Sequence, residues 1–389
     1  MNKLVIALML IALPFSALCQ DTSRLRISLL TCTPGDELYS LFGHSAIRIV
    51  DSSTVTDIVF NYGTFNFDDK NFYLKFARGK LDYFLSLEYY NDFVSLYQNT
   101  GRNITEQVLN LSSTEKINLQ NALLTNAREE NRYYKYDFFF DNCTTRLRDL
   151  IVQYKHPSPI LPPAMGSDMR FREAIHEYLD NGKQYWSKLG IDILLGTPTD
   201  AIMTASQQQF LPNNLMTAID SCKNTVLVSK KSATLAYTLL IPKAATITPM
   251  VLFITLLVLF GLLSRTSSPF LVSLLKRLDS LLFFTTGLLG IILLFMWFGT
   301  DHSMTKQNFN LWWAFPTNAI VAFFIPSNKK WPKSYFGIYA ILLAVLLITW
   351  FLLPQQLNIA LIPLVVLLLF RSTTLYLFHG KEKNNLARG

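Results

Sequence analysis

The sequence predicts an exported α+β domain followed by an α-helical membrane domain. Residues 1–19 have the layout of a signal peptide, residues 20–243 mix strand and amphipathic helix patterns, and residues 244–378 consist largely of apolar runs. Half of the 389 residues are hydrophobic and only 16% are charged. This composition is typical of a chain that is partly embedded in a membrane.

The N-terminus has the three parts of a signal peptide. Lys3 supplies a positive charge, Leu4–Leu13 is apolar, and Pro14–Cys19 ends in small residues. The apolar core is too short to span a bilayer, so we predict cleavage before Gln20. Cys19 also raises the alternative of a lipidated N-terminus, but Leu18 before it is larger than such a site usually has.

The exported part, residues 20–243, is long enough for one domain with a sizeable core. Strand patterns come first, followed by mostly helical patterns. The predicted strands are Arg26–Cys32, His44–Val50 and Asp57–Tyr62, and the predicted helices include Asn118–Arg132 and Arg170–Leu179. Strands followed by helices indicate the α+β class.

The remaining chain contains about five apolar runs long enough to approach a bilayer width. They are Ile247–Leu263, Leu281–Trp297, Leu311–Ile325, Tyr335–Leu353 and Leu357 to about Phe370. Pro316 and Pro363 interrupt the third and the fifth. We therefore predict about five transmembrane helices in residues 244–378.

The charges on the connecting loops give an orientation. With the exported domain outside, the loops that carry Arg265, Lys276 and Lys330 lie inside, together with a cytoplasmic tail at residues 379–389. The positive-inside rule is then obeyed on each inner segment. The net charge of +8 reflects this topology, so we do not expect nucleic acid as a partner.

Three cysteines remain after the signal peptide. Cys32 and Cys222 could form a disulfide and leave Cys143 free, but we favour unpaired, buried side chains for both. No spacing of Cys, His, Asp or Glu suggests a metal site or a disulfide framework. We expect neither a metal nor another cofactor.

Asp141 and Asn142 place Cys143 at a predicted helix start. Asn142 is a good N-cap, Asp141 is a favourable acidic neighbour, and residues 146–152 continue with helical spacing. The positive end of a helix stabilises a thiolate, and the thiolate is the nucleophilic form of cysteine. Free N–H groups of the first turn could also hold the oxyanion of a tetrahedral intermediate.

His44 is the candidate base for Cys143. It follows Gly43 at the start of a predicted strand, and Asn61 at the end of the next strand is our candidate for the group that orients the imidazole. A cysteine and a histidine can also occur in one sequence by chance. The residues alone therefore leave open whether Cys143 and His44 are a catalytic pair or a coincidence. No other histidine except His302 lies in a context that suggests chemistry.

His302 and Asn308 belong to a polar loop that the topology places outside, directly before two tryptophans typical of a membrane interface. Either the loop is a solvated hairpin, or these two side chains bind a lipid headgroup. The aromatic stretch Asn71–Phe84 could likewise form a lip that dips into the headgroup region, or be ordinary core and surface.

Four separated blocks resemble the signature of a known family. In order along the chain they are Tyr39–Ala46, Asn61–Phe65, Gly101–Gln107 and Tyr136–Thr145. They are similar to blocks of the Lnb family, bacterial lipoprotein N-acyltransferases with a periplasmic domain followed by a membrane domain. The resemblance covers nearly the whole chain.

The resemblance implies a fold and a reaction. The exported domain would be permuted papain-like, as in lecithin:retinol acyltransferase, where the histidine precedes the cysteine. Cys143 would take an acyl chain from a phospholipid as a thioester and pass it to the α-amine of a diacylglyceryl-cysteine lipoprotein, with His44 as acid and then base. Asn142, Ser40, His302 and Asn308 would contribute to substrate binding.

The same resemblance places the protein in the bacterial inner membrane, with its N-terminal domain in the periplasm. Two alternatives remain open. One is a cysteine hydrolase on the same site, either a cell-wall peptidase or a phospholipase. The other is an envelope protein without enzymatic activity, which is weaker because a transporter would carry charges inside its spans, and these spans contain almost none.

Overall fold

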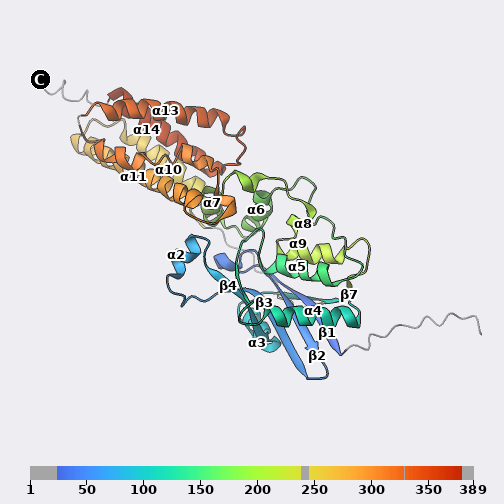
Figure 1. The fold of residues 1–389 in the computed structure, drawn as a ribbon. Coiled ribbons are helices and arrows are strands. Elements are labelled where there is room, and N and C mark those ends of the chain that lie inside the picture. Colours follow the sequence, from blue (N-terminus) through green and yellow to red (C-terminus); the bar gives the residue numbers. More distant parts are fainter. Residues whose placement is uncertain (1–23, 238–244, 328, 379–389) are drawn as a thin grey trace, which may run out of the picture.

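The computed structural model describes residues 24–237, 245–327 and 329–378. They form a sheet domain up to residue 237 and a helical domain from residue 245, which lie end to end (Figure 1). The predicted signal peptide, residues 1–19, and the predicted tail, residues 379–389, lie outside the described residues. An α+β domain followed by a helical membrane domain is thus confirmed.

The sheet has seven antiparallel strands in the order β6-β4-β3-β2-β1-β5-β7. The three predicted strands are confirmed as β1, β2 and β3, at the centre. The strands are β1 Leu25–Cys32, β2 His44–Asp51, β3 Thr56–Thr64, β4 Asp82–Tyr89, β5 Ile104–Leu109, β6 Tyr133–Lys135 and β7 Val228–Leu235.

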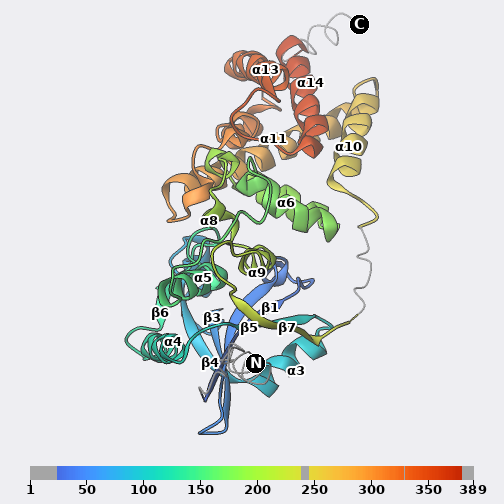
Figure 2. The same cartoon turned by 90° about the vertical axis from the view of Figure 1, so that its right-hand side faces the viewer.

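Helices cover both faces of this sheet because its central strands are apolar on both sides. The helices of this domain are α2 Phe72–Ala77, α3 Tyr90–Asn99, α4 Ser113–Asn126, α5 Cys143–Tyr154, α6 Phe171–Asn181, α7 Tyr185–Leu194, α8 Ala205–Gln208 and α9 Pro212–Asp220. Ile27 and Leu29 of β1 face the core under α4, α5 and α9, while Leu30 and Cys32 face α3. The helices α4 and α3 lie on opposite sides of the sheet (Figure 2).

The helix predicted at Asn118–Arg132 begins and ends earlier than expected. Ser112 and Glu115 form a capping box that fixes its start, in which each side chain bonds the other's backbone amide. The helix α4 therefore starts at Ser113 and ends at Asn126.

The helical domain contains four long apolar helices. They are α10 Pro249–Leu263, α11 Pro269–Phe298, α13 Trp331–Thr349 and α14 Ile362–Phe378. Three helical segments are long and apolar enough to cross a membrane, namely Pro269–Phe298, Trp331–Thr349 and Ile359–Leu377, while α10 is shorter. Four of the five predicted spans thus each overlap one of these helices.

The third predicted span, Leu311–Ile325, differs from the expectation of one regular helix. It consists of short 3-10 turns and the four-residue helix α12, Asn318–Val321. Pro316 lacks the amide that a continuous helix needs, and the side chains of Asn310 and Asn318 are buried in hydrogen bonds.

Two glycines of α11 let this irregular segment pack closely. A Cβ on Gly290 would lie 1.9 Å from the carbonyl oxygen of Ala314, and one on Gly287 would lie 2.0 Å from the amide of Ala319. Gly290 contacts Ala314, and Gly287, earlier in α11, contacts Ala319, later in the segment. The segment and α11 therefore run antiparallel. The segment still turns the chain back along α11.

A buried ion pair joins α11 and α14 at the end of the bundle far from the sheet domain. Arg371 forms two bonds of 2.7 Å with the carboxylate of Asp279, and its third nitrogen donates to Ser264. Both charged residues lie just outside the predicted apolar runs. Their pairing is consistent with the rule that charges near the bilayer find a partner.

Candidate active site

The candidate nucleophile begins helix α5. The side-chain oxygen of Asn142 accepts hydrogen bonds from the amides of Thr144 and Thr145 at 2.8 and 2.9 Å, and the hydroxyl of Thr145 accepts one from the Asn142 amide. This capping box confirms Asn142 as the N-cap. It fixes Cys143 as the first residue of the helix.

The cap narrows the choice of oxyanion donors. Because Asn142 occupies the amides of Thr144 and Thr145, only one amide of the first turn remains near the sulfur. Within the part of the chain that the structure describes, the amide of Cys143 itself makes no hydrogen bond.

His44 begins strand β2 directly after a tight turn. Gly43 has a φ of +80°, and a Cβ there would lie 2.7 Å from the carbonyl oxygen of Cys32, so only glycine fits. Nε2 of His44 donates to the side-chain oxygen of Asn61 at 2.6 Å, and the Asn61 amide donates to Glu88 at 2.7 Å. Three adjacent strands therefore orient the imidazole.

His44 lies close enough to the Cys143 thiol to act on its pKa through charge and side-chain hydrogen bonding. Because Nε2 of His44 faces Asn61, Nδ1 faces the sulfur. Burial raises the pKa of the Cys143 thiol, but the charge and hydrogen bond of His44, with bonds from the Ser45 amide and Thr144, outweigh burial and lower it to about 7. A thiolate is therefore available near neutral pH.

The pKa of His44 moves in the opposite direction. Burial lowers it, but the charge of Cys143 and hydrogen bonds to Cys143 and Asn61 raise it by more. The lowered pKa of Cys143 and the raised pKa of His44 thus both favour a thiolate beside an imidazolium. This is the arrangement that an activated cysteine nucleophile needs.

Alkylation by iodoacetamide should follow this lowered pKa. We expect the rate at Cys143 to rise with pH, with a midpoint near 7, because the thiolate reacts and its pKa is about 7. In His44→Ala, burial remains while the two largest lowering contributions are lost, so the midpoint should move above the ordinary thiol value. An unchanged midpoint would show that His44 does not activate the thiol.

The other cysteines allow a clean measurement. Cys32, Cys143 and Cys222 are all free, and Cys32 is buried as predicted, whereas the prediction that Cys222 is buried is wrong. Burial raises the pKa of Cys32 to about 12, so it stays unreactive. Cys222 is partly exposed, and Cys222→Ser removes it as a competing target.

Two tyrosines and a glycine border the space beside Cys143. A Cβ on Gly63, whose φ is +90°, would lie 3.6 Å from the Cys143 Cβ, 3.8 Å from the ring of Tyr136 and 3.9 Å from the Tyr134 hydroxyl. The Tyr134 hydroxyl is buried and has no hydrogen-bond partner among the described residues. The guanidinium of Arg146 lies 3.6 Å from the centre of the Tyr134 ring. Sequence reasoning missed Tyr134 as a candidate site residue.

Three predicted binding residues lie elsewhere. Ser40 donates its hydroxyl to the carbonyl of Glu37 in the turn before β2. His302 packs against Gly79, and the amide of Asn308 is buried and donates to the carbonyl of Ile193 at 2.7 Å. The structure brings together Cys143, His44, Asn61 and Asn142, whereas the binding roles of the other three stay predictions.

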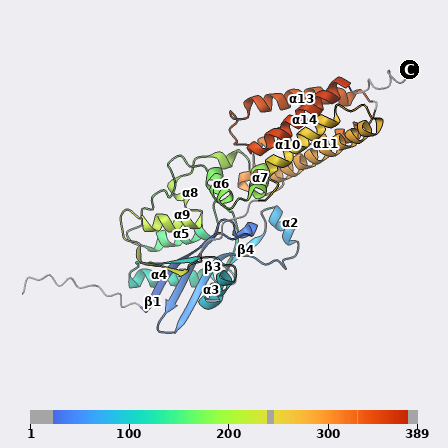
Figure 3. The same cartoon turned by 180° about the vertical axis from the view of Figure 1, so that it is seen from behind.

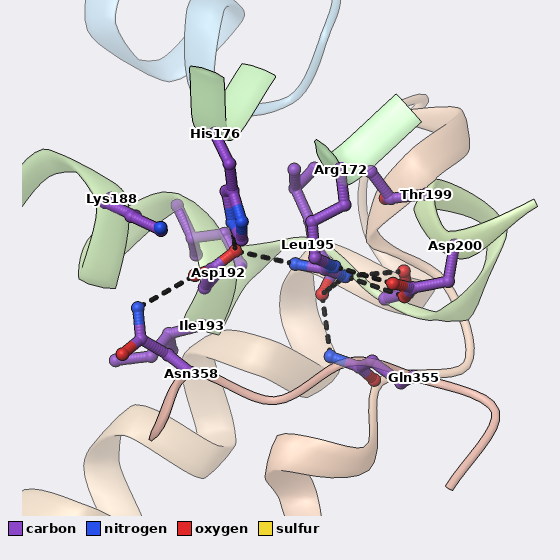
Figure 4. A network of polar contacts seen from close by, with 12 residues as sticks. Arg172, His176, Lys188, Asp192, Ile193, Leu195, Thr199, Asp200, Gln355 and Asn358 are labelled. Carbon is purple, nitrogen blue, oxygen red and sulfur yellow. Dashed lines mark hydrogen bonds and ion pairs between the residues drawn. The ribbon is translucent and has the colours of Figure 1, made fainter. Parts of the chain in front are cut away.

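A buried charge network lies where the two domains meet (Figure 4). Arg172 of α6 is fully buried, and its guanidinium bonds the carboxylates of Asp192 and Asp200, each at 2.9 Å. His176 contacts Asp192 at 2.7 Å. Burial raises the pKa of Asp192, but His176 and Arg172 lower it by more, so the carboxylate stays charged.

The same network reaches the membrane domain. Asn358 donates to the free oxygen of Asp192 at 2.8 Å, and Gln355 donates to the carbonyl of Leu195 at 2.9 Å. Asn308 bonds the end of α7, as described above. The loop between α13 and α14 and the loop after α11 are therefore both tied to α7 and the residues directly after it.

Further contacts tie the loop after α11 to the sheet domain. Ser303 donates to the carboxylate of Asp137 at 2.9 Å, and the amide of Asp301 donates to the carbonyl of Arg78 at 3.0 Å. Asp137 belongs to the loop that leads into Cys143. The candidate active site is thus held against the outer end of the helix bundle.

Among the described residues, no group of three or more His, Cys, Asp or Glu side chains could hold a metal ion.

Two family models match the chain in order. One, described as the Lnb N-terminal periplasmic domain, covers residues 19–162, and the other, described as the Lnb transmembrane domain, covers residues 241–383. No curated protein and no solved structure matches. The two models cover the sheet domain as far as α5 and the whole helix bundle. The chain belongs to the Lnb family, with a periplasmic N-terminal part and a membrane C-terminal part.

Proposed function

We propose that the protein is a membrane-anchored lipoprotein N-acyltransferase. It moves an acyl chain from a phospholipid through a thioester on Cys143 to the α-amine of a diacylglyceryl-cysteine lipoprotein. The observation that carries this proposal is the placement of His44, held by Asn61, beside a Cys143 thiol whose pKa is lowered. Membership of the Lnb family supports it.

In the first half-reaction, the Cys143 thiolate attacks the ester carbonyl carbon of the phospholipid. A carbon–sulfur bond forms, and the carbonyl electrons move to the oxygen. When the tetrahedral intermediate collapses, the carbon–oxygen bond of the ester breaks, and His44 donates its Nδ1 proton to the leaving oxygen. The products are a thioester and a lysophospholipid.

The amide of Cys143 and the hydroxyl of Tyr134 are the groups that we assign to the developing oxyanion. The amide has no partner among the described residues, and the buried hydroxyl has none either. Burial raises the pKa of Tyr134 strongly, so the phenol stays protonated and remains a donor. The Tyr134 hydroxyl and the Cys143 side chain both lie next to Gly63.

In the second half-reaction, the lipoprotein α-amine attacks the thioester. His44 takes a proton from the nitrogen, an amide bond forms, and the Cys143 thiolate leaves. Asn61 keeps Nδ1 of the imidazole toward the sulfur in both halves by holding Nε2, and Glu88 fixes the Asn61 amide. Asn61 is therefore a positioning residue in this mechanism.

The setting fits a reaction between two lipids. The site lies in a sheet domain that is bonded to the outer end of a helix bundle with three candidate spans. We place this bundle in the bacterial inner membrane and the sheet domain in the periplasm, where lipoproteins mature. The donor and the acceptor would then both reach Cys143 from the same membrane surface.

Mass spectrometry of lipoprotein N-termini tests this function in cells. In a bacterium whose sole N-acylation activity is supplied by this protein, deletion should leave diacylated lipoproteins with a free α-amine, and complementation should restore the N-linked chain. Persistence of the third chain after deletion would contradict the transferase function.

A further inference from the structure

An exposed aromatic lip projects from the sheet domain beside the helix bundle. We define it as residues 65–76, which comprise the loop between β3 and α2 and all of α2 except Ala77. Its large apolar side chains are mostly solvent-exposed: Phe67 at 62%, Tyr73 at 80%, Leu74 at 56% and Phe76 at 52%. Such a patch on one short segment is a mark of an interaction surface.

The lip lies at the level where the helix bundle meets the sheet domain. Figures 1 and 3 both show α2 beside the end of the bundle that faces the sheet. Arg78, two residues after the lip, accepts a hydrogen bond from Asp301, and Gly79 packs against His302. The residues that precede this loop, Trp297 and Phe298, end the membrane helix α11.

An unbroken row of aromatic rings connects the lip with the candidate active site. The row starts at Tyr136, which borders the space beside Cys143. Successive ring centres are 4.4 Å apart for Tyr136 and Tyr83, 5.3 Å for Tyr83 and Phe65, 5.8 Å for Phe65 and Phe72, and 6.2 Å for Phe72 and Phe76.

The inner end of this row suits an apolar chain. Burial raises the pKa of Tyr136 well above its usual value and that of Tyr83 to about 12, so both rings stay neutral. Gly63 leaves room between Tyr136 and Cys143, because a side chain there would stand in contact with both. An acyl chain that lies along the rings would therefore bring its ester to the sulfur.

We propose that the aromatic lip contacts the surface of the phospholipid bilayer and that the aromatic row leads the donor acyl chain from that bilayer to Cys143. This inference rests on the proposed function and names the route of its first substrate. The partner of the lip is the bilayer in which the protein's own helices sit. Aromatic side chains at a membrane surface are well suited to this contact.

The test compares two acyl donors on the full-length protein in vesicles. One donor is phosphatidylethanolamine in the vesicle, and the other is p-nitrophenyl butyrate in the water. The rate of Cys143 acylation is measured for both, and their ratio is compared between wild type and the double variant Tyr73→Ser, Phe76→Ser. The matched control, Leu96→Ser with Ile117→Ser, removes two exposed apolar side chains from α3 and α4.

We expect the lip variant to lower the ratio of lipid rate to soluble-ester rate about tenfold, since two apolar anchors are lost, and the control to keep the wild-type ratio. An unchanged ratio in the lip variant, or an equal loss with both donors, would overturn the inference. If the wild type accepts neither donor, the proposed function itself fails. The two failures are therefore distinguishable.

Discussion

Replacement of Cys143 by serine is expected to abolish N-acylation of lipoproteins, and His44→Ala is expected to reduce it about a thousandfold or more. Serine in place of Cys143 lacks the lowered pKa that His44 and the Ser45 amide give the thiol. Without His44, neither the thiolate nor the proton for the leaving oxygen is supplied. Complementation of the deletion strain with each variant, followed by mass spectrometry, measures the effect.

Two further variants serve as controls for this result. Cys222→Ser should complement fully, because Cys222 is a free cysteine for which the mechanism has no role. Protein levels of all variants are compared by immunoblot, so that loss of activity is not confused with loss of protein. Normal N-acylation by a well-expressed Cys143→Ser or His44→Ala would remove that residue from the mechanism.

Replacement of Arg172 by methionine is expected to have the largest effect on stability. It would leave the carboxylates of Asp192 and Asp200 buried without their cation, which costs about 3–5 kcal/mol. The lost contacts also hold Asp192 of α7 and Leu195 directly after it, which bond Asn358 and Gln355. Thermal unfolding of the full-length protein in detergent measures the change.

An exposed ion pair in the same region supplies the comparison. Lys188 bonds Asp180 at 2.7 Å, but the carboxylate of Asp180 is half exposed. Lys188→Ala should therefore change the free energy of unfolding by about 0–1 kcal/mol. Equal melting temperatures for Arg172→Met and Lys188→Ala would show that the buried network does not hold the domains together.

Local patterns in the sequence were sufficient to predict the core of the candidate site. Asn142 has both the residue type and the spacing of an N-cap, which places Cys143 at the helix start. Gly43 before an alternating apolar run predicts the sharp entry into β2 that positions His44. The position of Asn61 near His44 could be predicted as well, because the end of β3 lies beside the start of β2 when the two strands are antiparallel.

Other parts of the site depend on pairings that no local pattern reveals. Glu88 and Tyr134 lie on β4 and β6, and neither strand was predicted. Arg172 and Asp200 look like ordinary surface charges in the sequence, and only the fold buries them together. The third predicted span failed for a similar reason, since its asparagines are satisfied by tertiary contacts.

The buried charge network lies in the region between the two family matches, residues 163–240. This region contains α6 to α9 and β7, including Arg172, Asp192 and Asp200. These residues bond both loops at the outer end of the bundle. We infer that this region sets the position of the sheet domain relative to the helix bundle.

A chase of the acyl-enzyme tests the central claim most directly. The purified full-length protein is incubated with a phospholipid that carries a labelled acyl chain, and the label on Cys143 is followed by intact-protein mass spectrometry before and after addition of a diacylated lipopeptide. We expect a hydroxylamine-sensitive label on Cys143 that moves to the lipopeptide α-amine. A Cys143 that never carries the chain, or a chain released only as free fatty acid when the lipopeptide is present, would contradict this claim.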